Sequence, residues 1–451
     1  MRIKVTFGLL LLCALVSAQS LEEKYKAFQQ SAKNSYADFR DAANEKYASF
    51  LRSSWEYYKI LPAVKPPKEE PVPPVVYEEP EVKPEPQPIP QEDVTPVLSP
   101  DEQPEPIAPV VENDESSSTI SISFYGTDME FRHPSVHRLS LSGVSGETLE
   151  KAWLSLSDSR YDNLIFDCLK AREKYQLCDW AYYQMTKKLA EKIYGAKNEA
   201  VLLQAFIFAQ SGYAMRLAMS KESGRLCMLV GSQYKLYDFG YYYIDGLCYY
   251  PLMDVSESLS VCTGAFEHES PVSLLFGFDQ KLAHDDFSTK SRRSSMGVNA
   301  SCTVNRNQIS FYNDYPTGQI GDEFWTRWLV YANSPVEESV RNSLYPALSS
   351  SVRGVPEKQA VSKILNWVQT GFEYQYDDSV WGRDRAFFPS ESLYYPYADC
   401  EDRAILFSRI VRDLLNLDVA LIYYPGHLAA AVCFNQDVAG DFVTLNDKRY
   451  V

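Results

Sequence analysis

The feature that most constrains the fold is the pattern of one helix and two strands close to the C-terminal end of the chain. The helix pattern starts at Cys400, and apolar residues then recur at helical spacing along one face: Leu406, Phe407, Ile410, Val411, Leu414 and Leu415. Two apolar runs of strand length follow, over residues 419–424 and 428–434, and His427 opens the second. The pattern predicts an amphipathic helix and a hairpin, with a thiol and an imidazole at their ends.

A thiol at a helix start and an imidazole at a strand start can form a nucleophile and its base. The free N–H groups and dipole of a first helical turn favour a thiolate, so a lowered pKa is expected for Cys400. Asp399 is expected to cap the helix, with Asp402 as its reciprocal partner. Their charges work against a thiolate, which leaves more of the activation to His427. The alternative interpretation is a structural thiol and a hydrogen-bonded core histidine.

These residues resemble the transglutaminase-like branch of the papain-like cysteine enzymes. The resemblance rests on Tyr395–Ala404, with its Asp-Cys-Glu-Asp-Arg core, and on Tyr423–Val432, with its Pro-Gly-His core. Residues 372–391 also fit bacterial members of the branch. The resemblance covers residues 356–451, and Ala where the family usually has Gly before Asp-Cys is a mild departure. It implies a nucleophilic Cys400 and a basic His427.

The same resemblance implies an acid on the following strand that orients the histidine. Asp441 and Asp447 are the nearby acids, but they are expected to flank a strand and to occupy a turn. We therefore expect the third catalytic residue beyond Val451. The backbone N–H of the nucleophile would supply half of an oxyanion hole, and Trp381 or Tyr397 could supply the other half.

The expected function is that of a thiol enzyme acting on amide bonds of a protein or peptide substrate. Hydrolysis, as in a peptidase or amidase, is favoured over acyl transfer to amines, and the alternative is a catalytically inactive scaffold or binding protein. No cofactor is expected. No metal site is expected either, because the five histidines do not cluster. The net charge of −16 and the lack of a basic stripe argue against nucleic-acid binding.

The N-terminal part predicts export. Residues 1–18 have the charged start, apolar core and small-residue end of a secretory signal peptide, and no transmembrane segment is expected. A bacterial protein of the periplasm, cell surface or exterior is expected. Residues 19–61 repeat aromatic residues every 11 positions, which predicts one long helix with an aromatic stripe. The stripe over residues 21–61 could serve self-association, docking on the enzyme body, or partner binding.

The fold class expected for the rest is α+β. Residues 62–117 are rich in Pro and Glu and predict a disordered linker. An α+β domain over 118–255 could be a degenerate transglutaminase-like copy, with Asn198 or a neighbour near the place of Cys400; the alternative is an unrelated domain. A β-rich module over 256–335 and the catalytic domain over 336–451 follow. A disulfide between Cys227 and Cys248 is conceivable in an exported protein.

Overall fold

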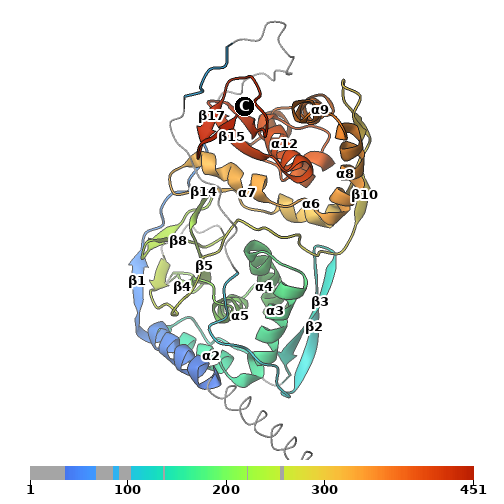
Figure 1. Ribbon diagram of the computed structural model, residues 1–451. Coiled ribbons are helices and arrows are strands. Elements are labelled where there is room, and N and C mark those ends of the chain that lie inside the picture. The colour runs from blue at the N-terminus through green and yellow to red at the C-terminus, as the bar shows by residue number, and fades with distance from the viewer. Residues whose placement is uncertain (1–35, 68–84, 91–102, 136–137, 221, 254–258) are drawn as a thin grey trace, which may run out of the picture.

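The computed structural model describes residues 36–67, 85–90, 103–135, 138–220, 222–253 and 259–451. The predicted signal peptide over 1–18 and the first aromatic repeats lie outside these residues. The described chain mixes helices and strands, in agreement with the α+β prediction. Figure 1 shows a lower body, which holds the larger sheet, and an upper body, which holds the C-terminal helices and hairpins.

The lower body is built on a six-stranded antiparallel sheet with the order β1-β9-β4-β5-β8-β7. Its strands are β1 (Trp55–Tyr58), β4 (Met215–Met219), β5 (Leu226–Ser232), β7 (Tyr242–Ile244), β8 (Leu247–Tyr250) and β9 (Leu259–Cys262). The helices beside it are α2 (Gly146–Leu156), η1 (Ser159–Tyr161), α3 (Asp162–Lys174), α4 (Asp179–Tyr194) and α5 (Asn198–Gln210). The hairpin of β2 (Ser117–Phe124) and β3 (Thr127–Pro134) packs on α3. Helix α5 is apolar on all sides and almost wholly buried, which makes it the centre of this body.

Part of the aromatic stripe packs on the lower body of the same chain, whereas Tyr36 and Phe39 are exposed. Tyr47 is 1% exposed, and its ring centre lies 4.5 Å from that of Trp153 and 4.6 Å from that of Phe266. The predicted continuous helix to residue 61 is wrong, since the described helix covers 36–53 and Trp55–Tyr58 forms β1. After residue 53 the backbone no longer continues the helix and instead pairs with β9, a strand far away in the sequence. This strand pairing overrides the helical pattern of the local repeat.

The described parts of the predicted linker are held against both bodies. The guanidinium of Arg172 donates to the carbonyl of Pro104 at 2.9 Å, and Ile107 N–H donates to the carbonyl of Gln210 at 3.2 Å. Ile89 N–H donates to the carbonyl of Phe442 at 2.7 Å. The prediction of a disordered spacer is therefore wrong for these residues, because backbone hydrogen bonds fix a segment that has little apolar content to bury.

The segment between the bodies is less β-rich than predicted. Its strands are the short β10 (Asp286–Ser288), β11 (Arg292–Arg293), β12 (Asn299–Ala300), β13 (Thr303–Asn305) and β14 (Gly318–Ile320), of which β14 pairs with β6 (Tyr234–Leu236). Two alternating runs in the module predicted to be β-rich, over 308–312 and 325–331, are helical and fall in α6 (Arg306–Asn313), η2 (Phe324–Arg327) and α7 (Trp328–Asn333). Short aromatic-rich runs fit the period of a helix as well as that of a strand. Here Tyr312 of α6 and Tyr331 of α7 pack on Phe388, which favours the helical form.

The upper body has the helix and hairpin that the sequence predicts. Its elements are α8 (Glu338–Val352), α9 (Glu357–Thr370), α10 (Asp377–Val380), α11 (Pro389–Tyr394), α12 (Cys400–Leu415), β15 (Asp418–Tyr424), β16 (His427–Cys433), β17 (Val443–Leu445) and β18 (Lys448–Tyr450). Helix α12 packs on β15, β16 and α9. Ile405 joins the core that continues from the lower body, whereas Ile410 joins a separate core under α8 and α9. Helix α12 is thereby held by two cores.

The described part of the chain has eight cysteines, and all are free thiols. Cys227 on β5 lies opposite Ala218, whereas Cys248 on β8 lies opposite Ser232, so the register separates the two cysteines considered for a disulfide. Among the described helices, none has both the length and the apolar character of a membrane span.

Candidate active site

The first turn of α12 is fixed by a capping box. Asp399 has an extended backbone, and its carboxylate accepts hydrogen bonds from Glu401 N–H at 3.1 Å and from Asp402 N–H at 3.3 Å. The carboxylate of Asp402 accepts from Asp399 N–H in return, at 3.3 Å. The predicted cap and reciprocal partner are confirmed. Cys400 is consequently the first helical residue, between the cap and the acids of the first turn.

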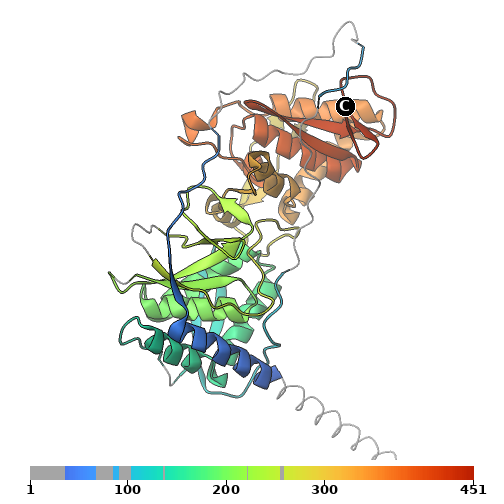
Figure 2. The ribbon, with the colours of Figure 1, turned by 90° about the vertical axis from the view of Figure 1, so that its left-hand side faces the viewer.

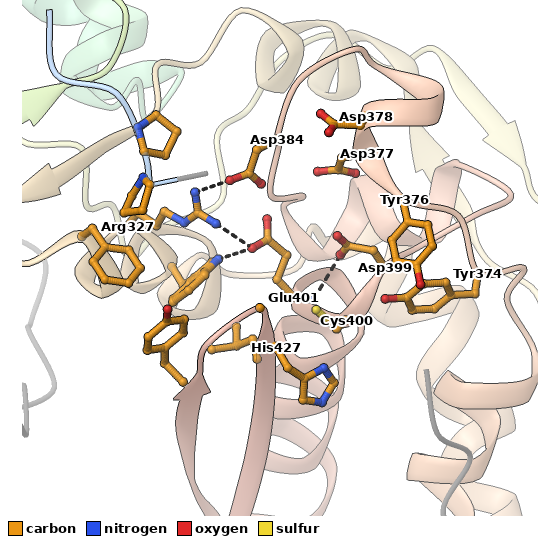
Figure 3. A pocket seen from close by; sticks show the side chains of 17 residues that line it. Arg327, Tyr374, Tyr376, Asp377, Asp378, Asp384, Asp399, Cys400, Glu401 and His427 are labelled. Carbon is orange, nitrogen blue, oxygen red and sulfur yellow. Dashed lines mark hydrogen bonds and ion pairs between the residues drawn. The ribbon is translucent and has the colours of Figure 1, made fainter. Parts of the chain in front are cut away.

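The hairpin of β15 and β16 positions the imidazole. His427 is the first residue of β16 and pairs with Tyr424 across the turn at Pro425 and Gly426. Because α12 packs on β16, Cys400 and His427 line one cavity of about 290 Å³. Figure 3 shows them on the same side of this cavity, each from the start of its own element.

The thiol is less acidic than its position at a helix start predicts. The pKa of Cys400 is raised to about 12, first by burial and then by the charges of Asp399, Glu401 and Asp402. The backbone N–H of Leu428 acts in the opposite direction through a hydrogen bond. The predicted lowering is wrong because burial, together with the charges of the neighbouring carboxylates, outweighs the effect of the helix start.

The imidazole is neutral in the resting site. Burial lowers the pKa of His427, and its Nδ1 atom is buried without a hydrogen-bond partner among the described residues. Within the described chain, no hydrogen bond joins the thiol of Cys400 to the ring of His427. The resting pair is therefore a thiol and a neutral imidazole, and any proton transfer must accompany reaction.

A group of carboxylates forms the wall beside the thiol (Figure 3). Oxygen atoms of Asp377, Asp384 and Glu401 lie within 4.8 Å of one another. Glu401 Oε2 accepts hydrogen bonds from Arg327 at 3.1 Å and from Trp328 Nε1 at 2.5 Å, whereas its Oε1 is buried without a partner in the described structure. Carboxylate oxygens are the ligands that Ca²⁺ and Mg²⁺ take in proteins, so these are the residues that could hold a cation.

Burial, and then neighbouring charge, raises the pKa of two carboxyls beside the thiol. The pKa of Asp377 is raised to about 8, first by burial and then by the charge of Glu401. The pKa of Asp399 is also raised to about 8, by burial and then by the charge of Asp377. The sequence did not indicate this group, because Asp377 and Asp384 come from a short helix and a loop with no motif of their own.

The two side chains expected to complete an oxyanion hole, Trp381 and Tyr397, do not line the cavity. The ring of Trp381 packs against Tyr395 and under the guanidinium of Arg385, 4.4 Å from its carbon. Tyr374 lines the cavity instead.

Burial raises the pKa of the Tyr374 hydroxyl, and the charges of Cys400 and Asp399 raise it further, so this side chain is a protonated donor close to the thiol. The backbone N–H of Cys400 has no hydrogen-bond partner among the described residues. The sequence offered no signal for Tyr374 beyond an aromatic residue upstream of the motif.

The two acids considered near the histidine have other roles. The carboxylate of Asp441 accepts from Gln87 N–H at 3.0 Å. Asp447 lies in the turn between β17 and β18 with a φ of 60°, in the left-handed region, as its assignment to a turn predicts. Neither residue lines the cavity.

The chain matches no protein-family model, no curated protein and no solved structure.

Proposed function

We propose that the chain is an exported thiol enzyme that cleaves amide bonds of a protein or peptide substrate, with Cys400 as nucleophile and His427 as base. The observation that carries the proposal is the shared cavity, which both side chains line. The helix start and strand start that hold them are the arrangement expected of a transglutaminase-like, papain-like site. The signal-peptide pattern of residues 1–18 supports export.

The neutral resting pair defines the order of events. His427 takes the proton from Cys400 as the sulfur attacks the carbonyl carbon, and the tetrahedral intermediate then collapses to a thioester. The proton passes from the imidazolium to the departing amine. Water attacks the thioester in the same way, releases the acid and restores the thiol. A primary amine in place of water would give acyl transfer.

The oxyanion of the intermediate needs two donors. The N–H of Cys400 is one, since the cap leaves it without a partner in the described structure. The hydroxyl of Tyr374 is the second, because its pKa is raised and it lines the same cavity. The acids beside the thiol oppose a preformed thiolate, so oxyanion stabilisation must supply much of the rate.

A second candidate is a binding protein that keeps this architecture without turnover. The raised pKa of Cys400 and the unpartnered Nδ1 of His427 favour it, because a triad needs an oriented imidazole. Both candidates predict ligand binding in the cavity, and only the enzyme forms a thioester.

A trapping experiment separates the two. The full chain is incubated with a panel of fluorogenic peptidyl amides, and intact-mass spectrometry detects an acyl adduct. The enzyme predicts an adduct and release of fluorophore that Cys400→Ala and His427→Ala abolish, whereas Cys433→Ala, a change at another partly exposed thiol, retains both. Product analysis with added methylamine separates hydrolysis from acyl transfer. No adduct with any substrate would favour the binding protein.

A further inference from the structure

The cavity of Cys400 receives two residues from the opposite end of the chain. Pro66 and Pro67 line it, together with Phe324, Arg327 and Trp328. Figure 2 shows how they arrive there: after β1 the chain rises along the lower body and reaches the upper body. Both prolines belong to the segment that its composition predicted to be a free spacer.

Backbone hydrogen bonds fix the approach to the cavity. Leu61 N–H donates to the carbonyl of Tyr241 at 2.7 Å, and Tyr241 N–H donates back to the carbonyl of Leu61 at 3.2 Å. Asp238 N–H donates to the carbonyl of Val64 at 3.1 Å. A Cβ atom on Gly240 would lie 2.8 Å from Ile60 Cδ1, so a residue without a side chain permits this close passage.

The chain is held again after the cavity. Gln87 N–H donates to the carboxylate of Asp441 at 3.0 Å, and Phe442 N–H donates to the carbonyl of Gln87 at 3.0 Å. The described residues on both sides of the gap at 68–84 are therefore attached to the protein. The pair Pro66 and Pro67 lies between two anchors.

Part of the cavity lining that includes Pro66 and Pro67 is aromatic. The ring centre of Phe324 lies 5.0 Å from that of Tyr423, and the ring centre of Trp328 lies 5.6 Å from it. Grooves lined by aromatic rings bind extended proline-containing peptides, because proline fixes the backbone and loses little entropy on binding. All three aromatic residues line the cavity with the thiol.

We propose that residues 61–67 are an intramolecular competitor, which occupies the aromatic end of the Cys400 cavity and must be displaced by an extended peptide substrate. That the displacing peptide is a substrate rests on the proposed function, but occupancy of the cavity by residues 61–67 does not. The segment is suited to this role because Pro66 and Pro67 have no N–H, so the contact with the wall forms without a hydrogen bond that would lock it.

The contact is also built to be reversible. Pro67 is exposed and Pro66 is partly exposed. Within residues 61–67, Val64 is the last residue with a backbone hydrogen bond to the rest of the described chain. A peptide can therefore lift the two prolines from the wall while the bonds at Leu61 and Val64 remain.

The test removes the apolar contact. The double variant Pro66→Asp/Pro67→Asp replaces both proline rings in the cavity lining with hydrated carboxylates, which would lose their water against Phe324 and Trp328, and so weakens occupancy by the segment. The matched control, Pro90→Asp/Pro109→Asp, adds the same charge at exposed prolines outside the cavity and outside residues 61–67.

Two reagents report on access to Cys400 in these variants. A peptidyl chloromethyl ketone must bind in the peptide groove, whereas iodoacetamide needs access only to the thiol. A change in the acidity of the thiol alters both alkylation rates and therefore cancels in their ratio. A competitor bound nine-tenths of the time reduces apparent affinity about tenfold, so the ratio should rise about tenfold in Pro66→Asp/Pro67→Asp and stay unchanged in the control. An equal ratio in all three proteins would overturn the inference.

Calorimetry with a synthetic peptide of sequence 61–67 gives a second readout. The peptide should bind Pro66→Asp/Pro67→Asp more tightly than the wild-type chain, in which the site is filled. Equal binding to both, or binding to neither, would overturn the inference. Neither the alkylation ratio nor calorimetry requires turnover. Both results therefore test occupancy of the cavity even if the protein does not cleave amide bonds.

Discussion

Removing the charge of Asp399 should make Cys400 more reactive. The carboxylate of Asp399 is the largest charged contribution to the raised pKa of the thiol. The change Asp399→Asn keeps the helix cap, because Asn and Asp cap helices about equally well. The substitution therefore alters the charge beside the sulfur and leaves the first turn of α12 in place.

The structure sets the size and the pH range of this effect. The rise from an ordinary pKa of 9.0 to about 12 corresponds to about 4 kcal/mol, shared between burial and charge. A like charge at contact distance accounts for about one pKa unit of such a rise, so the thiolate fraction should increase about tenfold. The gain should appear above pH 8 and fade below it, because the pKa of Asp399 is itself about 8.

The assay is alkylation by iodoacetamide across a pH series, read by mass spectrometry of the Cys400 peptide. The Cys433 peptide of the same protein serves as an internal reference, since that thiol is also partly exposed. The control is Asp413→Asn at the far end of α12, where the carboxylate bonds Tyr345. Equal rates for Asp399→Asn and wild type at about pH 9.5, or the same gain in the control, would refute the electrostatic account.

Three further outcomes are expected. The unfolding free energy should fall as pH rises from about 4 to about 8. The cause is that Asp377 and Asp399, with ordinary pKa values of 3.8, bind protons more tightly in the folded chain. In urea titrations, the unfolding free energy of Asp377→Asn should depend less steeply on pH than that of the wild type. The change Asn44→Ala should cost about 3 kcal/mol in the same titrations, since it removes the buried acceptor of Trp153 Nε1 and of a second amide. Added formate should raise the turnover of a peptidyl amide, because His427 Nδ1 has no partner in the described chain; turnover that is flat across formate concentrations would show that the imidazole is already oriented.

The helix and hairpin of the candidate site were predictable because their signals are local. The apolar stripe after Cys400, the cap at Asp399 and the turn before His427 each depend on neighbours within a few positions. The burial of the thiol was not predictable, because it depends on segments far along the chain that line the cavity, such as the one that holds Asp377. Burial is the first cause of the raised pKa of Cys400, and it reverses the expectation from the helix start alone.

The prediction for the N-terminal segment was wrong because its structure depends on residues far away in the sequence. Among the described residues, the aromatic repeat predicts the helix correctly over 36–53, where Tyr47 packs on Trp153. Beyond it, β9 offers a free strand edge, and a sequence period carries no information about an edge more than 200 positions away. The prolines at 66 and 67 were assigned to a spacer by composition, which likewise says nothing about an aromatic wall supplied by other segments.

The two bodies use the same position for different purposes. Helix α5 begins at Asn198 and is followed by the hairpin of β4 and β5, just as α12 begins at Cys400 and is followed by the hairpin of β15 and β16. Asn198 Oδ1 accepts from Leu226 N–H at the start of β5, at 2.9 Å, and its Nδ2 donates to the carbonyl of Gly224 at 2.9 Å. In the upper body, the thiol receives the N–H of Leu428 near the start of β16.

This correspondence fits the predicted duplicated unit, in which the lower copy has a structural amide where the upper copy has the proposed nucleophile. The change Asn198→Ala should then lower the unfolding free energy by about 1–3 kcal/mol, because it leaves the partly buried Leu226 N–H without an acceptor. The same change should leave alkylation of Cys400 unaltered. The reciprocal change, Cys400→Ala, should cost less stability, since a thiol is a weak acceptor. A larger loss from Cys400→Ala than from Asn198→Ala would contradict this division of roles, because it would make the thiol the main structural contact of its own hairpin.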